Sequence, residues 1–239
     1  MIGLGTIINA AAILAGGMLG GIFGRFLHDS AQDTLNKVCG VSTLFIAVTG
    51  VLEKMLRIEN GIIVSDGAML MIGCLAIGAI FGEWMNIEGA FERFGQWLKI
   101  KSGNAKDKGF VNAFVTASLT VCIGAMAIVG SIQDGLTGDY SILATKAVLD
   151  LIIIMVMSCS MGKGAVFSAI PVAAFQGSIT LLAGLLRPIM TDAALHNLSL
   201  VGNVLIFCVG INLVWGKKVK VANLLPAIVV AVAAAFIPI

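Results

Sequence analysis

The sequence predicts an all-α polytopic membrane protein, and three observations support this fold class. Of the 239 residues, 59% are hydrophobic and only 12% are charged, about half the charge of a water-soluble domain. The apolar residues form continuous runs close to the roughly 20 residues that a transmembrane helix needs, whereas a membrane β-barrel would show alternating segments of about ten residues. Glycine is abundant, at 29 residues, and small residues allow membrane helices to pack closely.

The apolar runs predict a bundle of seven or eight transmembrane helices in a single domain of residues 1–239, because the connecting loops are short. The first run lacks a basic leader and a cleavage site, so we expect it to be a retained transmembrane helix. The predicted spans cover residues 2–26, 38–56, 62–83, 110–132, 141–161, 165–186, 199–216 and 221–238.

Lysine and arginine counts in the loops predict the orientation, because these residues are enriched on the cytoplasmic side of a membrane. An arrangement of eight spans places eleven of them on one side and three on the other, with both termini outside. The three are Lys54, Arg57 and Arg187. The eleven are Arg25, Lys37, Arg93, Lys99, Lys101, Lys106, Lys108, Lys163, Lys217, Lys218 and Lys220.

The longest loop predicts an amphipathic helix at about residues 84–100 that lies in the membrane interface. Its apolar residues recur at helical spacing, with charged residues among them. Trp84 and Trp97 are of the type that anchors a helix at headgroup depth.

The predicted span at 141–161 carries Lys146 and Asp150 four residues apart, on one helix face. A charge at membrane depth costs at least a few kcal/mol and normally faces a bundle interior or a watery cavity. One interpretation is a carboxylate that couples or selects a transported ion, with the lysine as its partner. The alternatives are an ion pair that fixes helix packing, and a Lys146 that extends to the outer interface and leaves Asp150 alone.

Polar residues in the preceding span form a stripe. Asn112, Thr116 and Thr120 recur at i, i+4 and i+8, and a short connection makes this span an antiparallel neighbour of the charged one. We expect the stripe to face Asp150 and line a pathway; hydrogen bonding between helices is the alternative role. Four asparagines in other spans are expected to serve packing, namely Asn9, Asn203, Asn212 and Asn223.

Small residues after the charged span, together with Pro171, predict a broken helix near residues 158–171. Broken helices at membrane depth line cavities and often bind ions or substrate. In that role Ser158, Ser160 and Gln176 would supply neutral ligands. The alternative is a tight loop followed by a kinked helix.

The motif GGIFG at residues 20–24 recurs as GAIFG at residues 78–82. This recurrence suggests internal repeats of the kind found in transporters, with shared glycine-rich composition as the alternative. The spacings Gly16–Gly20, Gly17–Gly21 and Gly20–Gly24 also offer a close-packing face, which serves either a homo-oligomer or packing within the subunit.

Enzyme signatures are missing from the sequence, including HExxH, GxSxG and the Walker loop, and the two histidines lie in loops. The five cysteines fall inside apolar runs without CxxC spacing, a pattern typical of buried free thiols. We therefore expect no enzyme, no metal site, no cofactor and no nucleic-acid partner. The expected partners are the lipid bilayer and an unidentified ion or small polar solute.

Four stretches carry a resemblance to a known family: GTIINAAAILAGGMLG at 5–20, GAMAIVGSIQDGLTGDYSILATKAVLD at 124–150, FSAIPVAAFQGSITLLAG at 167–184 and VGNVLIFCVGINLVWGKKVKVANLLPA at 201–227. In these, and over essentially its whole length, the chain resembles a bacterial membrane family catalogued as domain of unknown function 554, often labelled as transport proteins. The resemblance implies a compact inner-membrane protein of seven or eight spans. It supplies neither a substrate nor catalytic residues.

Together these features predict a small membrane transporter or channel for an ion or small polar solute, with its pathway between the fourth, fifth and sixth spans. Asp150 would be the coupling or selectivity carboxylate and Lys146 its partner. Neutral ligands would come from Asn112, Thr116, Thr120, Ser158, Ser160 and Gln176. The alternative is a non-transporting membrane sensor, regulator or scaffold with a sealed polar core.

Overall fold

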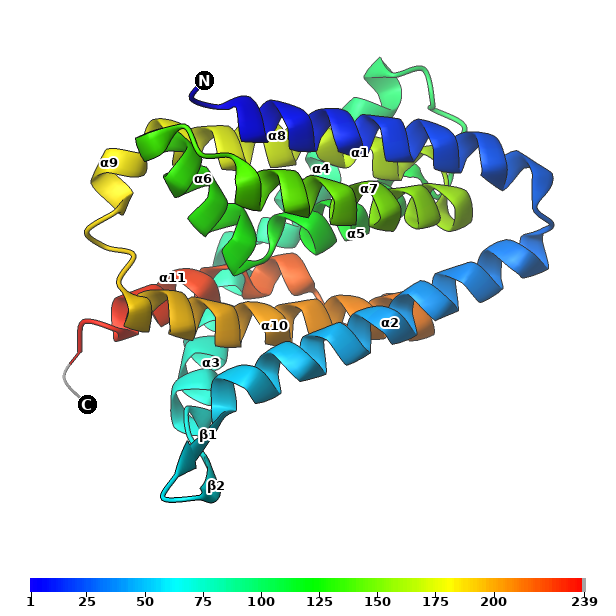
Figure 1. The fold of residues 1–239 in the computed structure, drawn as a ribbon. Helices are drawn as coiled ribbons and strands as arrows, with labels where there is room; N and C mark the ends of the chain where they lie inside the picture. The colour runs from blue at the N-terminus through cyan, green and yellow to red at the C-terminus, as the bar shows by residue number, and fades with distance from the viewer. Residues whose placement is uncertain (238–239) are drawn as a thin grey trace.

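The computed structural model describes residues 1–237 and confirms an all-α polytopic membrane fold (Figure 1). Within these residues, six helices are long and apolar enough to cross a membrane, and one bent helix pair gives a seventh. A shorter apolar stretch follows at Val221–Ala234. The expected count of seven or eight therefore exceeds the six or seven that length and composition support, because the last span is too short.

The helices are α1 (Leu4–Phe23), α2 (Asp29–Met55), α3 (Ala68–Met85), α4 (Ile87–Lys101), α5 (Phe110–Cys122), α6 (Ala125–Thr137), α7 (Ser141–Met161), α8 (Ala169–Leu181), α9 (Ala183–Leu186), α10 (Asp192–Trp215) and α11 (Pro226–Ala234). Short 3-10 helices are η1 (Gly24–Phe26), η2 (Lys163–Ser168) and η3 (Val221–Leu224), and the strands are β1 (Leu56–Glu59) and β2 (Ile62–Ser65).

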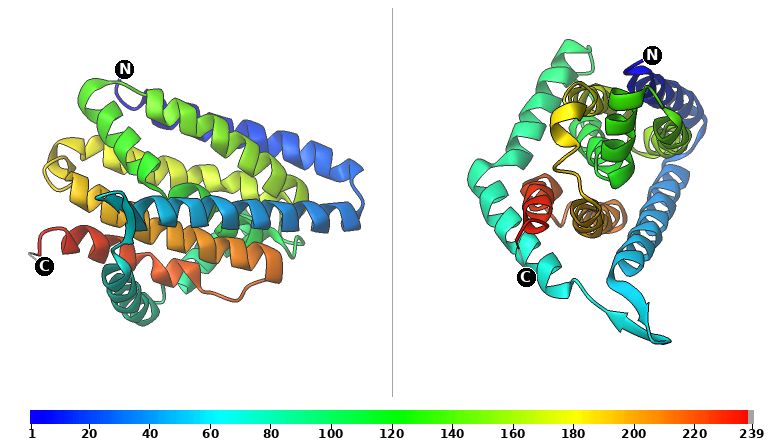
Figure 2. Two further views of the ribbon diagram at one scale, coloured as in Figure 1. Left: turned by 60° about the horizontal axis from the view of Figure 1, so that its bottom comes forward. Right: turned by 60° about the vertical axis from the view of Figure 1, so that its left-hand side comes forward.

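The long helices run side by side in two groups. α1 packs along α7 and next to α8 in one group, and α2 packs along α10 next to α11 in the other, with α5 and α6 between them (Figure 1). α3 and α4 run across this bundle on one side, while α2 borders the other side (Figure 2). The N-terminus and the last turn of α11 lie at the same end of the bundle (Figure 1).

The span predicted at 62–83 begins later in the structure. Residues 62–65 form strand β2, which pairs antiparallel with β1, and the helix starts at Ala68. Asn60 and Gly61 at the hairpin tip both have positive φ, 51° and 79°, the geometry that makes an Asn-Gly pair a strong hairpin signal. The apolar residues of β2 hid this signal, because they continue directly into the helix.

The span predicted as one helix at 110–132 is instead the bent pair α5 and α6. The two helices meet at 63°, and α6 continues to Thr137 through residues that we expected to form a loop. Gly124 stands at the bend with φ 152° and ψ 147°, a conformation essentially restricted to glycine. The break in a membrane helix therefore lies here and not near residues 158–171, where it was predicted.

Near residues 158–171 the chain makes a turn. α7 ends at Met161, Gly162 has φ 98°, and η2 then leads into α8. Pro171 falls in the first turn of α8, where its missing N–H and its ring cost little, so the expected kink is absent. The helix predicted from residue 199 begins earlier, at Asp192, because the Thr191 side chain caps it by accepting from the Ala194 N–H at 3.2 Å.

Glycines allow α1 to lie directly against the backbone of α7. A β-carbon at Gly16 would sit 2.3 Å from the Leu151 carbonyl oxygen, and one at Gly20 would sit 2.1 Å from that of Met155. Backbone atoms cannot yield to such overlaps, so only glycine fits. The close-packing face of the predicted GxxxG motif is therefore used within the subunit, and the homo-oligomer stays a prediction.

Glycines of both copies of the recurring motif lie directly against the backbone of another element, although α1 runs parallel to its neighbour and α3 antiparallel to its own. A β-carbon at Gly82, the last glycine of the second copy, would lie 1.8 Å from the Asn223 carbonyl oxygen. The segments after α7 and α10 are also alike: Gly162 and Gly216 both have positive φ with ψ near 180°, and each is followed by a lysine, a 3-10 helix and a proline near the start of the next helix. These parallels agree with the suggested internal repeats.

Replacing Gly20 by alanine should destabilise the protein by about 1–3 kcal/mol, because overpacking against rigid backbone cannot relax. The measurement is thermal unfolding of the purified protein in detergent. Gly21→Ala is the matched control, since a β-carbon at Gly21 meets nothing within 4 Å. Equal melting temperatures for the two variants would contradict the α1–α7 packing.

Candidate functional site at the helix break

The bend between α5 and α6 leaves a backbone carbonyl without a helical partner inside the bundle. α5 ends at Cys122, so no following turn donates to the carbonyl of Val121. The Lys146 ammonium of α7 donates to this oxygen at 2.8 Å. A side chain from the neighbouring helix thus satisfies the broken end, as irregular backbone at membrane depth requires.

The same ammonium pairs with Asp150, one turn further along α7. Only 8% of the Lys146 side chain and 4% of the Asp150 side chain is exposed. Lys146 therefore does not extend to the interface, and the two charges compensate each other. Removing either partner would leave the other charge buried and unpaired, which is strongly unfavourable.

Several neutral polar side chains are buried in α1, α7, η2 and α8 and find no hydrogen-bond partner among residues 1–237. Asn9 faces the Asp150 carboxylate, yet neither of its amide atoms makes a hydrogen bond of standard geometry. Both amide atoms of Gln176 are also unpaired, and this side chain is 1% exposed. The hydroxyls without a partner belong to Thr6, Ser158, Ser168 and Thr180.

Helix register brings Gln176 of α8 to the depth of the unpaired groups of α1. Gly17 of α1 lies against Val166 of η2, and α8 runs back antiparallel to α1 from there. Gln176 comes ten residues after Val166, about 15 Å along a helix axis at 1.5 Å per residue. This rise carries Gln176 to the level of Thr6 and Asn9.

Asp134 of α6 fixes the same end of α1. Its carboxylate is fully buried and accepts the N–H groups of Gly3 and Gly5 at 3.2 and 3.0 Å, an arrangement that suits an anion at a helix N-terminus. The next residue, Gly135, lies against the Thr180 carbonyl oxygen. Thr180 therefore belongs to the same depth as the start of α1.

We name this set of side chains the polar layer. It contains the ion pair, which lies at the broken end of α5, and two neutral side chains, Asn9 of α1 and Gln176 of α8. Thr6 and Thr180 lie closer to the start of α1 and are not counted in it. The members of the polar layer are Asn9, Lys146, Asp150 and Gln176.

The predicted site residues divide into three groups. Lys146, Asp150 and Gln176 lie in the polar layer, whereas Ser158 lies against Gly20, farther along α1. Ser160 donates to the Val156 carbonyl of its own helix at 3.0 Å, and Thr120 likewise donates to the Thr116 carbonyl at 2.8 Å. Asn112 and Thr116 line a separate pocket near α4.

The polar stripe of α5 therefore does not face Asp150, which corrects the expectation from its spacing. α5 presents the carbonyl at its C-terminal end to Lys146, while Asn112 and Thr116 turn toward α4 and α10. The sequence missed Asp134, Thr6 and Thr180 altogether. Asn9 was assigned to packing, because a lone amide in an apolar helix carries no sign of its neighbours.

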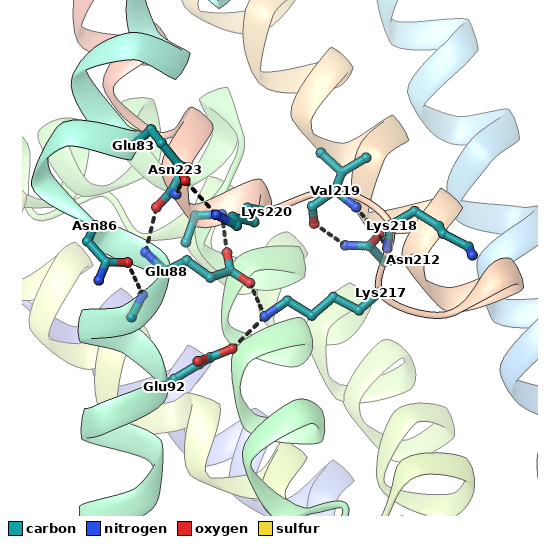
Figure 3. Close-up of polar contacts among 12 residues, drawn as sticks. Glu83, Asn86, Glu88, Glu92, Asn212, Lys217, Lys218, Val219, Lys220 and Asn223 are labelled. Carbon is teal, nitrogen blue, oxygen red and sulfur yellow. Dashed lines mark hydrogen bonds and ion pairs between the residues drawn. The ribbon is translucent and has the colours of Figure 1, made fainter.

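The pocket beside α4, which we call the α4 pocket, has a volume of about 320 Å³. Lys217 closes it on one side by bridging Glu88, at 2.9 Å, and Glu92 (Figure 3). Partial burial alone would lower the pKa of Lys217, but hydrogen bonds to the carboxylates of Glu92 and Glu88 outweigh it and raise that pKa. The polar residues that line the α4 pocket are Glu88, Glu92, Gln96, Lys108, Asn112, Thr116, Asn212 and Lys217.

Glu88 joins α4 to the chain that enters α11. Its backbone N–H donates to the Asn223 amide oxygen at 2.7 Å, and its carboxylate accepts the Ala222 N–H at 3.0 Å (Figure 3). Asn212 accepts the N–H groups of Lys218 and Val219. The packing role predicted for Asn212 and Asn223 is thus confirmed, and α4 matches the predicted amphipathic helix as a helix held to the bundle by polar contacts.

An apolar cavity of about 550 Å³ borders the helix break at Ile123 and Gly124. Leu119 lines both this cavity and the α4 pocket, so it marks the boundary between a polar and an apolar space. Among the residues that the structure describes, no group of three or more histidine, cysteine, aspartate or glutamate side chains is placed to hold a metal ion.

Comparison with known proteins gives a family and two relatives. The family described as "Protein of unknown function (DUF554)" matches residues 4–236. "Uncharacterized membrane protein YdfK" of Bacillus subtilis (strain 168) is 30% identical over 226 residues, covering 95% of this chain and 93% of the relative. "Uncharacterized protein YqgA" of Escherichia coli (strain K12) is 26% identical over 232 residues, covering 95% and 94%. No solved structure matches the chain.

Breaking the buried ion pair should cost about 3–5 kcal/mol, because one charge is left buried without a partner. Lys146→Gln and Asp150→Asn are each expected to lower the melting temperature in detergent, and the double variant should recover at least half of the loss. Lys37→Gln is the control, since Lys37 pairs with Asp33 at the same i, i+4 spacing but on an exposed surface, where a pair contributes about 0–1 kcal/mol. A double variant whose loss equals the sum of the two singles would contradict the coupling.

Lys217→Met should loosen α4 from the bundle, because it removes both ion pairs to Glu88 and Glu92. Hydrogen exchange of the α4 amides measures this effect and is expected to become faster. Lys218→Met is the matched control, because the adjacent side chain is exposed and forms no ion pair within residues 1–237. Equal exchange rates in the two variants would show that Lys217 does not hold α4.

Proposed function

The chain belongs to the family described as Protein of unknown function (DUF554), and we propose that it is a small transporter or channel for an ion or small polar solute. Its pathway would pass the helix break between α5–α6, α7 and α8, with α1 as a further wall. Asp150 is the coupling or selectivity carboxylate in this proposal. The cytoplasmic membrane, with both termini outside, is the proposed location, because most lysines and arginines lie in loops at the opposite side.

The observation that carries the proposal is the polar layer at the broken helix. A polar atom that is buried without a partner costs about 1–3 kcal/mol. The amides of Asn9, which faces the Asp150 carboxylate, and of Gln176, at the depth of Asn9, together leave four such atoms. A protein that only needs a stable core gains nothing from this arrangement. A solute that enters the layer would supply the missing partners.

The arrangement of the two cavities supports a route to the layer. Asn112 and Thr116 give the α4 pocket a polar wall on the lysine-rich side, and beyond Leu119 the apolar cavity reaches the break at Gly124. Leu119 is therefore the proposed constriction between the pocket and the break. Transport is favoured over catalysis because no second acid pairs with Asp150 among the residues that the structure describes.

A non-transporting sensor, regulator or scaffold is the alternative function. It is supported by the ion pair, because the charges of Lys146 and Asp150 would also compensate each other in a sealed core without a pathway. It predicts that the unpaired amides of Asn9 and Gln176 matter only for packing. The two functions differ in whether any solute binds the folded protein.

A solute that binds the layer must raise the stability of the folded state, by about 2.7 kcal/mol at a concentration of 100 Kd. We expect at least one compound from a panel of ions and small polar metabolites to raise the melting temperature of wild type in detergent. Asp150→Asn should abolish this shift and the flux of the same compound into proteoliposomes. Asp33→Asn, on the exposed surface of α2, should retain both.

The opposite result would establish the non-transporting alternative, in which the polar core is sealed. In that case no compound shifts the melting temperature of wild type, and proteoliposomes show no flux above empty vesicles. Both measurements are needed, because a weakly bound channel substrate produces flux without a measurable shift.

A further inference from the structure

We propose that the polar layer exchanges a small monovalent cation for a proton, with Asp150 binding the cation and Lys146 releasing the proton. The inference rests on the proposed transport function and names the chemistry of its site. It follows from the net charge of the layer, from the type of its unpaired ligands and from the contacts of Lys146.

Among the side chains that the structure describes, the layer holds one negative charge, on Asp150, and one positive charge, on Lys146. α1 and α8 carry no titratable side chain. The buried Asp134 of α6 is engaged by the N–H groups of Gly3 and Gly5. The remaining titratable residues on elements packed against α7 are Cys122 of α5, Arg25 of η1, Lys163 of η2, and Asp29, Asp33, Lys37, Cys39, Glu53 and Lys54 of α2.

The unpaired groups suit a small, hard cation. Asn9 faces the single carboxylate and Gln176 lies at the depth of Asn9, so their unpaired amides offer neutral oxygen ligands, and hard cations take oxygen ligands. One carboxylate balances one positive charge. Since no cluster of three acidic, histidine or cysteine residues occurs within residues 1–237, an alkali ion fits this set better than a multivalent metal.

A cation and the Lys146 ammonium cannot both remain at Asp150. Together they would leave one uncompensated positive charge in the bundle interior, at a cost that paired charges avoid. The layer stays neutral if the ammonium loses one proton to water as the cation binds the carboxylate. Charge then balances: one cation enters, one proton leaves, and no bond other than the N–H of Lys146 is broken.

The contact of Lys146 with the broken helix fits this exchange. A neutral amine keeps two N–H donors, so it still satisfies the Val121 carbonyl after it has lost its proton. The end of α5 therefore has a hydrogen-bond partner in both states. Asp150 alone changes partner, from the ammonium to the cation.

The test measures proton release by the full-length protein in weakly buffered detergent solution with a pH-indicator dye. NaCl, LiCl and KCl are the probes, and choline chloride controls for ionic strength. For wild type, at least one alkali salt should release close to one proton per protein at saturation. The apparent affinity should fall about tenfold for each pH unit below the midpoint, as one exchanged proton requires.

Variants separate the roles of the two charges. Lys146→Arg, whose guanidinium keeps its proton, should release no proton and should bind the cation at least tenfold more weakly, and Asp150→Asn should bind none. Lys163→Gln, at an exposed position in η2, should release protons as wild type does. If Lys146→Arg does not fold, Gln176→Leu replaces it: the cation affinity should fall about tenfold while the proton count per bound ion stays at one.

Three results would overturn the exchange. Wild type releases no proton with any of the three salts, Lys146→Arg releases as many protons as wild type, or Gln176→Leu binds the cation unchanged. If a solute from the panel still stabilises wild type in a way that depends on Asp150, transport stands and only the cation exchange fails; a zwitterion that contacts both charges would behave so. If no solute binds at all, both proposals fail.

Discussion

A buried lysine with two partners is the contact on which the centre of this protein depends. Lys146 compensates the charge of Asp150 and also satisfies the carbonyl at the broken end of α5. Each of these groups would be costly at membrane depth without it. The bend of α5–α6 and the charges of α7 therefore stabilise each other, and neither has a counterpart elsewhere among the described helices.

The close glycine contact between α1 and α7 brings α1 alongside the ion pair. Because Gly16 and Gly20 let α1 approach the backbone of α7, Asn9 comes to face Asp150. Asp134 fixes the position of the α1 N-terminus, because its carboxylate accepts the N–H groups of Gly3 and Gly5. The result is a layer in which charge is balanced but the amides of Asn9 and Gln176 lack partners, the feature from which transport and cation exchange are inferred.

Periodicity and composition were sufficient for the parts of the fold that are set locally. The span at 141–161 was predicted with the bounds that α7 has, and the amphipathic helix within three residues of α4. The hairpin at Asn60-Gly61 and the early start of α10 at Asp192 were missed. Both depend on short turn and cap signals, which long apolar runs on either side obscured.

By itself, the sequence determined the membrane class, the bounds of α7 and the placement of Lys146 and Asp150 on one helix face, because an i, i+4 spacing brings two side chains to the same side of a helix. That the two charges pair, and that Lys146 does not extend to the interface, was left open. Only the tertiary structure decided what faces that pair. The polar stripe of α5 was expected there, but the bend at Gly124 offers a carbonyl instead, and Asn9 and Gln176 arrive from helices far apart in the chain. Contacts between helices depend on their rotation and depth, which a single helix does not encode.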